Sequence, residues 1–571
     1  MRTGRPDGGS IVTTDSAEGV SALGQLASSQ RQRHDVFVGL VAPIGTSRAD
    51  VIEEFRHRSL EYGYDLREIH LAALLDEVPR QDGTTLPGRD EPDYYEMRMN
   101  AGNEFRKSAG DWSALAALAV ARATHERGQR LLAASGEPES LRPTLYVFDN
   151  LKHPSEARLL RNVYGSAFWL IALVQDAEER KQNLAEELAK QAGQFDSVPE
   201  ARAIELIARD EAEPDAKHGQ HVRDVFASAD FFLPVQRGAN WQHGVARFFR
   251  GAFNDPFVSP SVAEEAMRHA QAASLRSAAV GRQVGAVIVP PAGAPFVLGT
   301  NEVPKPGGGQ FREGDIPDHR DFRAGADPNP AYNERVIREL MVRLAEAGFF
   351  SDERNRAGGA AVLAEAMTQD PATGRSILDG SRAISLIEFT RCLHAEQAAI
   401  VDAARTGTAI GGGRMYTTTF PCHECTKFIV GSGIVEVQYI EPYPKSLAGD
   451  LYRDLIDTRP PLETESPDEF EVKRVPFRPF LGFGPTRFDE VFIAGERRER
   501  DSARVLRHVP GESFPIGSGW SEAAVREMED KVALAIANET AKIQEKLKVS
   551  KPEDTKPVEV PDEGVHRAEP S

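Results

Sequence analysis

The sequence has few cysteines, few tryptophans, no long hydrophobic run and no excess of positive charge. Its 571 residues include three cysteines and four tryptophans, and the net charge is −19. Three cysteines do not make a disulfide framework and suit a reducing compartment, so we expect a cytoplasmic protein. No apolar run is long enough to span a bilayer and no signal peptide is visible, so we expect no membrane partner. The acidic balance argues against general attraction to nucleic-acid phosphates.

The length predicts two or three domains with ample core. Residues 1–33 are polar and have no apolar core, and residues 546–571 are charged and rich in proline, so both segments are predicted to be disordered. Between them we expect two α/β units, residues 34–250 and residues 255–545. The second unit carries an insertion at about 305–385.

The strongest chemical signal is a pair of short motifs in the second unit. His394-Ala395-Glu396 is followed by Pro421-Cys422-His423-Glu424-Cys425. Imidazole and thiolate are preferred zinc ligands, and a catalytic zinc has three protein ligands with a fourth position open. His394, Cys422 and Cys425 supply three ligands, which leaves Glu396 free to move protons beside the metal. We therefore predict a catalytic Zn²⁺ centre with Glu396 as the catalytic acid and base.

The competing interpretation is a structural zinc site with four protein ligands. Cys392 lies two residues before His394 and could supply the fourth ligand. That arrangement would leave Glu396 without a role. We favour the catalytic interpretation and expect Cys392 to be a small buried thiol beside the site.

The periodicity around these motifs places both halves of the site at helix starts. Residues 394–404 and 422–429 have helical patterns, and residues 414–419 and 435–440 alternate like strands. An extended approach is expected over 384–389. The positive potential at a helix N-terminus favours thiolate over thiol.

The segment from about residue 260 to 450 resembles the deoxycytidylate deaminase family, which has the cytidine deaminase fold. The matching motifs are QVGAVIV at 283–289, GTNEVP at 299–304, HAE at 394–396 and PCHEC at 421–425. The pattern His-x-Glu with Pro-Cys-x-x-Cys is the signature of zinc-dependent base deaminases. The resemblance implies hydrolytic deamination of a deoxycytidine nucleotide by a protein that is usually a homo-oligomer.

The same resemblance assigns two substrate-binding residues. Asn301 is expected at the substrate sugar or at the mouth of the base pocket, although a residue after Gly299 could also be a simple turn residue. Tyr443 follows the last core strand and is expected either to stack on the base or to close the loop. Three arginines that could bind substrate phosphate are scattered along the chain: Arg276, Arg282 and Arg391.

The insertion at about 305–385 separates this chain from free-standing members of the family. It is too long for a turn, and we expect a lid, a gate or a partner surface. A mobile decoration is the alternative. Residues 334–347 have a helical pattern within it.

The first unit begins with a strand, a glycine turn and a helix, the frame of a phosphate-binding loop. The loop match is imperfect, because Thr46 stands where that motif has lysine, after Gly45 and before Ser47. Asp149 ends a second apolar strand, where a Mg²⁺-linked carboxylate would lie. We predict a P-loop kinase-like parallel α/β domain that binds a nucleotide weakly, with Mg²⁺, at Gly45, Thr46, Ser47 and Asp149, or that regulates the deaminase. Without the lysine, we do not expect an active kinase.

A P-loop kinase-like domain followed by a deoxycytidylate deaminase domain resembles the bacterial antiphage dCTP deaminases. The resemblance implies deamination of dCTP, dCMP or both, which depletes the pool that a phage needs, and inhibition by a small RNA in some members. Two alternatives stay open. A single-stranded nucleic-acid cytidine deaminase is disfavoured by the acidic charge and few tryptophans, and a nucleotide-sensing regulatory protein is disfavoured by the intact zinc and Glu396 motifs.

Overall fold

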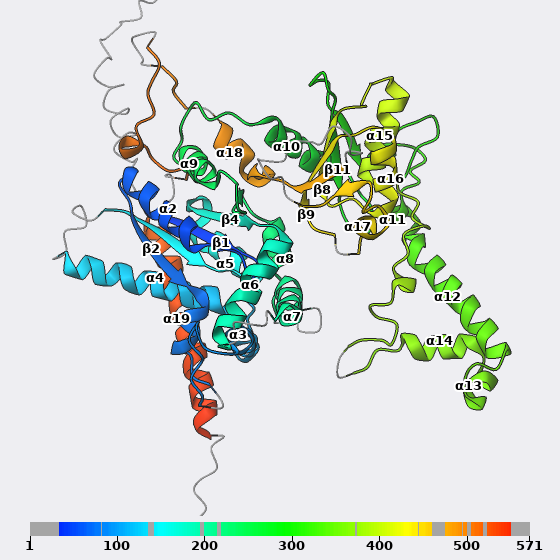
Figure 1. The fold of residues 1–571 in the computed structure, drawn as a ribbon, viewed down its shortest axis with the longest axis horizontal. Coiled ribbons are helices and arrows are strands. Elements are labelled where there is room, and N and C mark those ends of the chain that lie inside the picture. Colours follow the sequence, from blue (N-terminus) through cyan, green and yellow to red (C-terminus); the bar gives the residue numbers. More distant parts are fainter. Residues whose placement is uncertain are drawn as a thin grey trace, which may run out of the picture.

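The computed structural model builds the chain around two six-stranded sheets (Figure 1). It describes residues 34–549 apart from short gaps at 81–82, 135–141, 194–198, 214–218, 372–373, 444, 460–473, 494, 499–503 and 518–521. The predicted disordered segment 1–33 and residues 550–571 of the predicted tail lie outside the described residues. Residues 546–549 of that tail belong instead to the last helix, α19 (Glu522–Val549).

The first sheet has the strand order β12-β5-β4-β1-β3-β2. Its strands are β1 (Val36–Val41), β2 (Asp65–His70), β3 (Thr144–Asp149), β4 (Phe168–Val174), β5 (Phe231–Pro234) and β12 (Gly482–Phe483). All neighbouring pairs are parallel except β12 with β5. The strands β1, β3 and β4 are buried along their whole length, as expected for a parallel sheet covered on both faces. The predicted parallel α/β architecture is confirmed for this unit.

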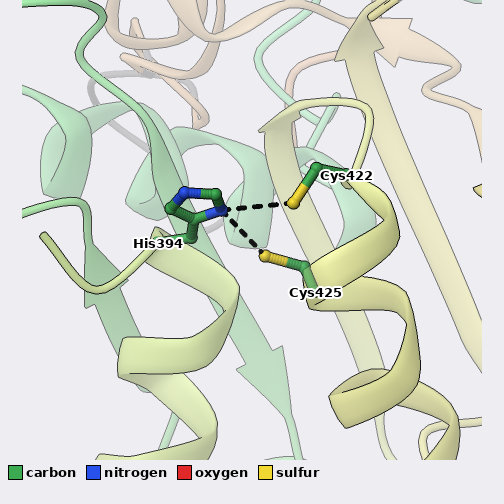
Figure 2. Close-up of side chains that lie close together, drawn as sticks. All are labelled: His394, Cys422 and Cys425. Carbon is green, nitrogen blue, oxygen red and sulfur yellow. Dashed lines mark hydrogen bonds between the residues drawn. The ribbon is translucent and has the colours of Figure 1, made fainter. Parts of the chain in front are cut away.

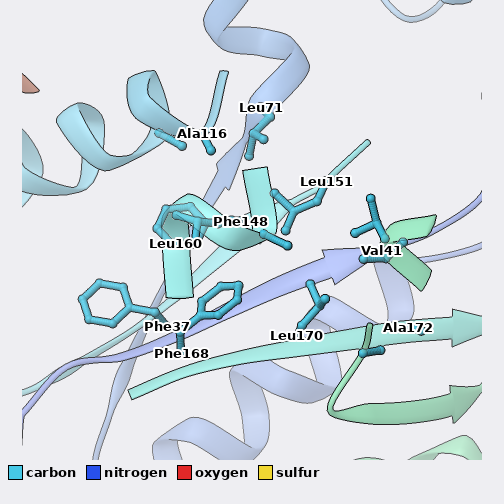
Figure 3. Close-up of a cluster of buried hydrophobic side chains, with 14 of the residues drawn as sticks. Phe37, Val41, Leu71, Ala116, Phe148, Leu151, Leu160, Phe168, Leu170 and Ala172 are labelled. Atoms are coloured by element: carbon cyan, nitrogen blue, oxygen red, sulfur yellow. The ribbon is translucent and has the colours of Figure 1, made fainter. Parts of the chain in front are cut away.

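Alternate residues of β1 face two separate layers of the core. Phe37 and Val41 belong to the layer in Figure 3, with Ala116 of α4 (Ala114–Ala133) and Leu160 of α5 (Pro154–Tyr164). The opposite layer contains Val38 and the aromatic side chains of α2 (Ala49–Glu61) and α9 (Trp241–Ala252). The remaining helices of this unit are η1 (Leu71–Glu77), α3 (Tyr94–Ala109), η3 (Gly165–Ala167), α6 (Ala177–Gln191), α7 (Glu200–Glu211) and α8 (Val222–Ala227).

The second sheet has the strand order β10-β11-β9-β8-β6-β7. Its strands are β6 (Gly285–Val289), β7 (Val297–Thr300), β8 (Arg414–Thr419), β9 (Glu436–Glu441), β10 (Ile456–Asp457) and β11 (Val475–Pro479). The hairpin β6–β7 is antiparallel, as is the pair β6–β8, and the pairs β8–β9 and β9–β11 are parallel. The helices α10 (Val262–Ser274), α15 (Ala395–Thr406) and α16 (His423–Gly431) pack with it, and α17 (Ala448–Leu451) follows β9.

The approach of α15 to β7 depends on a glycine. A Cβ at Gly299 would lie 1.9 Å from the carbonyl oxygen of Ala395 and 2.6 Å from the amide nitrogen of Ala399. A side chain at this position would push the first turn of α15 away from the sheet. The glycine of the GTNEVP motif therefore fixes the depth at which His394 and Glu396 lie.

The chain returns from the second sheet to the first after β11. Phe480 is fully buried and its ring packs edge-on against Phe232 of β5. On the first unit, Arg487 lies over the ring of Trp169 at 3.7 Å and donates to the carbonyl of Phe168. The short helices η5 (Pro485–Arg487), α18 (Phe488–Phe492) and η6 (Pro510–Glu512) follow, and α19 packs on α4. The domain range 255–545 stays a prediction, but its last part contributes a strand and a helix to the first unit.

The insertion forms a helical arm that projects from the second unit (Figure 1). It contains α11 (Asp321–Ala324), α12 (Pro328–Glu346), α13 (Asp352–Ala357), α14 (Gly359–Met367) and η4 (Arg382–Ile384). The helix expected at 334–347 is present as α12. The extended approach expected over 384–389 is wrong: no strand forms there, and side chains of α12 hold the segment in place of a neighbouring strand. None of the described helices is long and apolar enough to cross a membrane.

A buried ion pair ties α3 to α5 and yields a stability prediction. Arg106 and Glu156 have side chains 1% and 0% exposed, with nitrogen and oxygen 2.7 Å apart. Replacing Arg106 with Met leaves Glu156 buried without its cation, so we expect a loss of about 3–5 kcal/mol in the free energy of unfolding. Urea unfolding followed by tryptophan fluorescence would measure it, because Trp169 is fully buried in this unit.

The matched control for this variant is Arg343→Met, which breaks an exposed pair with Glu339 on α12. We expect a change of about 0.3–0.5 kcal/mol there. Equal effects of the two variants would contradict the role given to the buried pair.

Candidate active site

Two helix starts bring the three predicted zinc ligands together. His394 is the N-terminal cap of α15, and Cys422 is the cap of α16, with Cys425 in the first turn of that helix. The His394 Nδ1 atom lies 3.2 Å from Cys422 Sγ and 3.3 Å from Cys425 Sγ (Figure 2). The three ligand atoms all lie within 4.8 Å of one another.

The geometry and chemistry of this group fit zinc. Zinc–nitrogen and zinc–sulfur bonds of about 2.0 and 2.3 Å at a tetrahedral angle would place the two ligand atoms about 3.5 Å apart. The observed separations are close to that value. One imidazole and two thiolates form a soft donor set with one position left for another ligand. His394, Cys422 and Cys425 therefore form a zinc site, as predicted.

The pKa values of the two thiols shift in opposite directions. A hydrogen bond with Cys425 lowers the pKa of Cys422 to about 4, despite burial and with support from His394. Burial raises the pKa of Cys425 well above its usual value. The pair thus holds one negative charge without a metal, and a divalent cation would displace the remaining proton.

Glu396 lies in the first turn of α15, beside the ligands. Its side chain is 4% exposed, and burial, together with the negative charge on Cys422, raises its pKa to about 7. A carboxyl group with such a pKa exchanges its proton near neutral pH. It is not part of the ligand group, so it is available for proton transfer.

Cys392 lies outside the ligand group, as expected for the catalytic interpretation. The group found among the described residues holds His394, Cys422 and Cys425 and omits Cys392. The Cys392 thiol is half-buried and lies 3.6 Å from Asp321 Oδ2. Burial raises its pKa to about 12, so this thiol carries no charge at neutral pH.

A cavity of about 300 Å³ opens beside the zinc site. His394, Glu396 and Cys422 line its inner part, and the predicted substrate residues Asn301 and Tyr443 also line it. The substrate-binding role of Asn301 stays a prediction, and its side chain is held by two backbone contacts. Its Oδ1 accepts from the Val284 amide at 2.7 Å and its Nδ2 donates to the Arg282 carbonyl at 2.6 Å, while the residue still faces the cavity.

Basic side chains stand at the outer part of the cavity. Arg282 lies over the Tyr443 ring at 5.8 Å and pairs with Glu441 at 2.6 Å. Lys445 is exposed and lines the same cavity. Of the three scattered arginines, Arg282 alone lines this cavity, whereas Arg391 pairs with Asp321.

Several lining residues were not found from the sequence. Ile387 lies just after the insertion, where no motif marks it, and Lys445 lies beyond the last motif. Val284 lies within the QVGAVIV motif and Phe420 directly precedes Pro421, so these two motifs were the available signal.

The predicted nucleotide-binding residues lie together at the carboxyl edge of the first sheet. Gly45, Thr46 and Ser47 follow β1, and Asp149 ends the neighbouring β3. Arg48 Nε and His70 Nδ1 lie 2.8 and 2.9 Å from Asp149 Oδ2. Burial alone would raise the pKa of Asp149, but the charge of Arg48 and the hydrogen bond with His70 lower it to about 2.

Side-chain oxygens of the protein itself accept hydrogen bonds from the loop amides that would bind a phosphate. The Ile44 amide donates to Asp210 Oδ2 at 2.8 Å, and the Ser47 amide donates to Gln175 Oε1 at 3.0 Å. Gly45 has a φ of +82°, and a Cβ there would lie 2.3 Å from the Arg180 carbonyl of α6. Nucleotide binding at these residues stays a prediction, and it would require these contacts to be exchanged.

Comparison with known proteins identifies the second unit. Residues 260–441 match the family described as cytidine and deoxycytidylate deaminase zinc-binding region. Similar proteins include deoxycytidylate deaminase of Enterobacteria phage T2, 41% identical over 83 residues, which are 14% of this chain and 44% of the relative. The corresponding protein of phage T4 is 47% identical over 64 residues, 11% of this chain and 33% of the relative. The match thus spans less than half the length of either relative.

Solved structures of dCMP deaminase from the cyanophage S-TIM5 are also similar to part of the chain. The apo form is 17% identical and covers 39% of this chain and 99% of its own, with a TM-score of 0.19. The form in complex with dCMP and dUMP is 19% identical and covers 34% of this chain and 93% of its own, with a TM-score of 0.19.

The ligand assignment predicts how zinc content responds to substitution. The full-length protein should hold about one zinc per chain. Loss of an outer-shell partner costs about 10–100-fold in metal affinity, so loss of a direct ligand in His394→Ala, Cys422→Ser or Cys425→Ser should cost more than about 100-fold. Cys392→Ser is the control and should keep its zinc. Metal analysis after dialysis measures this, and zinc loss from Cys392→Ser would indicate a four-ligand structural site.

Proposed function

We propose that the second unit catalyses hydrolytic deamination of the cytosine ring in deoxycytidine nucleotides. The observation that carries the proposal is the buried Glu396 beside the three-ligand zinc site, at the inner end of a cavity large enough for a nucleoside. The family match of residues 260–441 supports the same reaction class. The name deoxycytidylate deaminase, given to the phage relatives, supports the choice of substrate.

Different residues of the chain bind the metal and transfer the protons. Zinc, when bound by His394, Cys422 and Cys425, supplies the positive charge that makes water a nucleophile near neutral pH. Glu396 accepts a proton from the attacking water, whose oxygen forms a bond to C4 of cytosine. Glu396 then delivers that proton to N3, and a proton passes to the exocyclic amine as the C4–N bond breaks. Ammonia leaves, and the product is the deoxyuridine nucleotide.

Position and burial give Glu396 this role. It lies two residues after a zinc ligand and has almost no contact with solvent, so a proton that it holds exchanges within the cavity. Asn301 is fixed by two backbone contacts, which suits a residue that orients the sugar or the base edge. Tyr443 offers a ring face at the cavity wall for stacking on the base.

We further propose that the substrate enters with its phosphates toward Arg282 and Lys445, which stand at the outer part of the cavity. The proposed orientation is the same for dCMP and dCTP. The resemblance to antiphage dCTP deaminases supports a role in defence by nucleotide depletion, with a homo-oligomer and an inhibitory small RNA as the partners that it implies. A single-stranded nucleic-acid substrate is the second candidate, and the net charge of −19 weighs against it.

One substrate panel tests the proposal. Zinc-loaded full-length protein is incubated with dCMP, dCTP, CTP and single-stranded DNA, and uracil products are quantified. We expect deoxyuridine nucleotides from dCMP, dCTP or both. Glu396→Gln keeps the shape but cannot shuttle protons, so turnover should fall by about 10²–10⁴-fold with zinc content unchanged. Near-normal turnover by this variant, or product from DNA alone, would overturn the assignment.

We also propose that the first unit is a P-loop kinase-like domain that binds a nucleotide, with Mg²⁺, near Gly45, Thr46, Ser47 and Asp149, without transferring phosphate. The clustering of these residues at the carboxyl edge of a parallel sheet supports it, since ligands bind at that edge in open α/β folds. The native loop has Thr46 where a phosphate-binding lysine would stand, which argues against phosphoryl transfer.

Calorimetry with ATP and dTTP tests the first unit. A hydrogen bond to a charged group is worth about 1.5–3 kcal/mol, so Ser47→Ala and Asp149→Asn should weaken nucleotide binding by about 10–100-fold. Glu53→Gln, on the exposed side of α2, is the control and should bind normally. Rapid phosphoryl transfer to a nucleoside monophosphate would contradict the non-kinase assignment. Unchanged binding and deamination in both variants would reduce the unit to a scaffold.

A further inference from the structure

The segment that joins the insertion to α15 forms part of the wall of the active-site cavity. Residues 385–393 lead directly from the helical arm into His394. Within this segment, Ile387 is half-buried and lines the same cavity of about 300 Å³ as Glu396 and His394. It also packs against the apolar cluster that contains Cys422 and Cys425. An aliphatic side chain from this connecting segment thus lies beside the zinc site.

The first turns of α12 hold the segment on either side of Ile387. Asn329 Nδ2 and Asn333 Nδ2 both donate to the Leu386 carbonyl, at 2.7 and 2.9 Å. The Phe389 amide donates to Asn329 Oδ1 at 3.2 Å. Asn333 is 2% exposed, so its hydrogen bond is shielded from water. These side-chain hydrogen bonds hold the backbone of the segment in place of the hydrogen bonds that a neighbouring strand would supply.

Further contacts fix the end of the segment nearest the metal site. Arg391 pairs with Asp321 of α11 at 2.8 Å, and the Leu393 amide donates to the Glu302 carbonyl at 3.1 Å. The Tyr332 and Phe389 rings stack with their centroids 5.5 Å apart. The insertion therefore determines where Ile387 lies relative to Glu396.

The burial of the lining residues indicates how a nucleotide would lie in the cavity. The inner part of the cavity is polar and buried, and the outer part carries the exposed Arg282 and Lys445. Val284 and Phe420 add apolar surface to the same wall. A nucleotide with its base at the zinc site and its phosphates outside would place the apolar face of its base and deoxyribose against this surface.

We propose that Ile387 is a substrate-positioning residue of the deaminase site, and that Asn329 and Asn333 hold it in place from the insertion. The inference rests on the proposed deamination of deoxycytidine nucleotides. It gives the insertion a defined task, which is to complete the apolar wall of the site and exclude water beside the base and sugar. Because this contact exists before and during the reaction, it contributes to binding more than to the chemical step.

Binding and kinetics of Ile387 variants test this directly. In the zinc-loaded Glu396→Gln protein, calorimetry gives the Kd of dCMP and dCTP without turnover. Ile387→Ala removes three carbon atoms from the wall, so the Kd should rise about 10- to 50-fold. Ile387→Val should restore binding to within about 3-fold. In the protein with Glu396 intact, KM should rise by a similar factor with kcat little changed.

The asparagines have their own matched variants. Asn333→Asp keeps the shape but cannot donate to the Leu386 carbonyl, and Asn329→Ala removes both of its contacts. Asn333→Asp should raise KM about 3- to 10-fold, the effect of one lost hydrogen bond, and Asn329→Ala should raise it at least as much. Arg338→Ala, on the exposed side of α12, is the control and should leave KM unchanged. Zinc content and circular dichroism confirm that each variant is loaded and folded.

The outcomes separate this inference from the proposed function. If the unchanged protein neither binds nor deaminates a deoxycytidine nucleotide, the proposed function fails and this inference fails with it. If it does both, and Ile387→Ala has an unchanged Kd and KM, the inference alone is overturned. A loss of zinc in Ile387→Ala and Ile387→Val would also overturn it, because Ile387 would then support the metal site and not the substrate. Normal KM in both asparagine variants would remove their positioning role.

Discussion

The close contact between α15 and the second sheet is the constraint on which the candidate site depends. Gly299 allows the first turn of α15 to lie directly on β7, which sets the depth of His394 and Glu396. The β8–α16–β9 crossover then presents Cys422 and Cys425 from the neighbouring helix start. Both metal half-sites lie at helix N-termini, whose partial positive charge suits thiolate ligands. The sheet therefore acts as a rigid base for a site assembled from two short motifs.

The two units are joined by more than one connection. The chain leaves the second sheet at β11 and adds β12 to the first sheet, with Phe480 buried between them. Glu264 of α10 accepts a hydrogen bond from the Phe483 amide and pairs with Arg247 of α9. A nucleotide bound to the first unit could affect the second only by binding two states of the protein with different affinity. The shared core offers a continuous physical link for such coupling.

The loop after β1 shows how a familiar local pattern can have a different set of contacts. Its strand, turn and helix match the frame of a phosphate-binding loop, yet Asp210 and Gln175 accept hydrogen bonds from its amides. Buried amides need partners, and the protein supplies them from α7 and from the residue after β4. Lys152 pairs with Asp210 at 2.8 Å, so the carboxylate at the loop is itself neutralised. The strand, turn and helix could be predicted from the local sequence, but the hydrogen-bond partners of the loop come from distant parts of the chain.

The sequence by itself determined the parallel strands of the first unit, the zinc ligands and the separate place of Glu396. These follow from short-range patterns: continuous apolar runs, helical spacing, and ligand types whose chemistry is independent of context. Only the tertiary structure decided that residues 482–483 join the first sheet, that Ile387 lines the cavity, and that residues 384–389 form no strand. In each case the deciding contact joins residues far apart in the chain, as when Asn329 and Asn333 bind the Leu386 carbonyl. Such contacts leave no local periodicity, because their energy depends on which surfaces meet after folding.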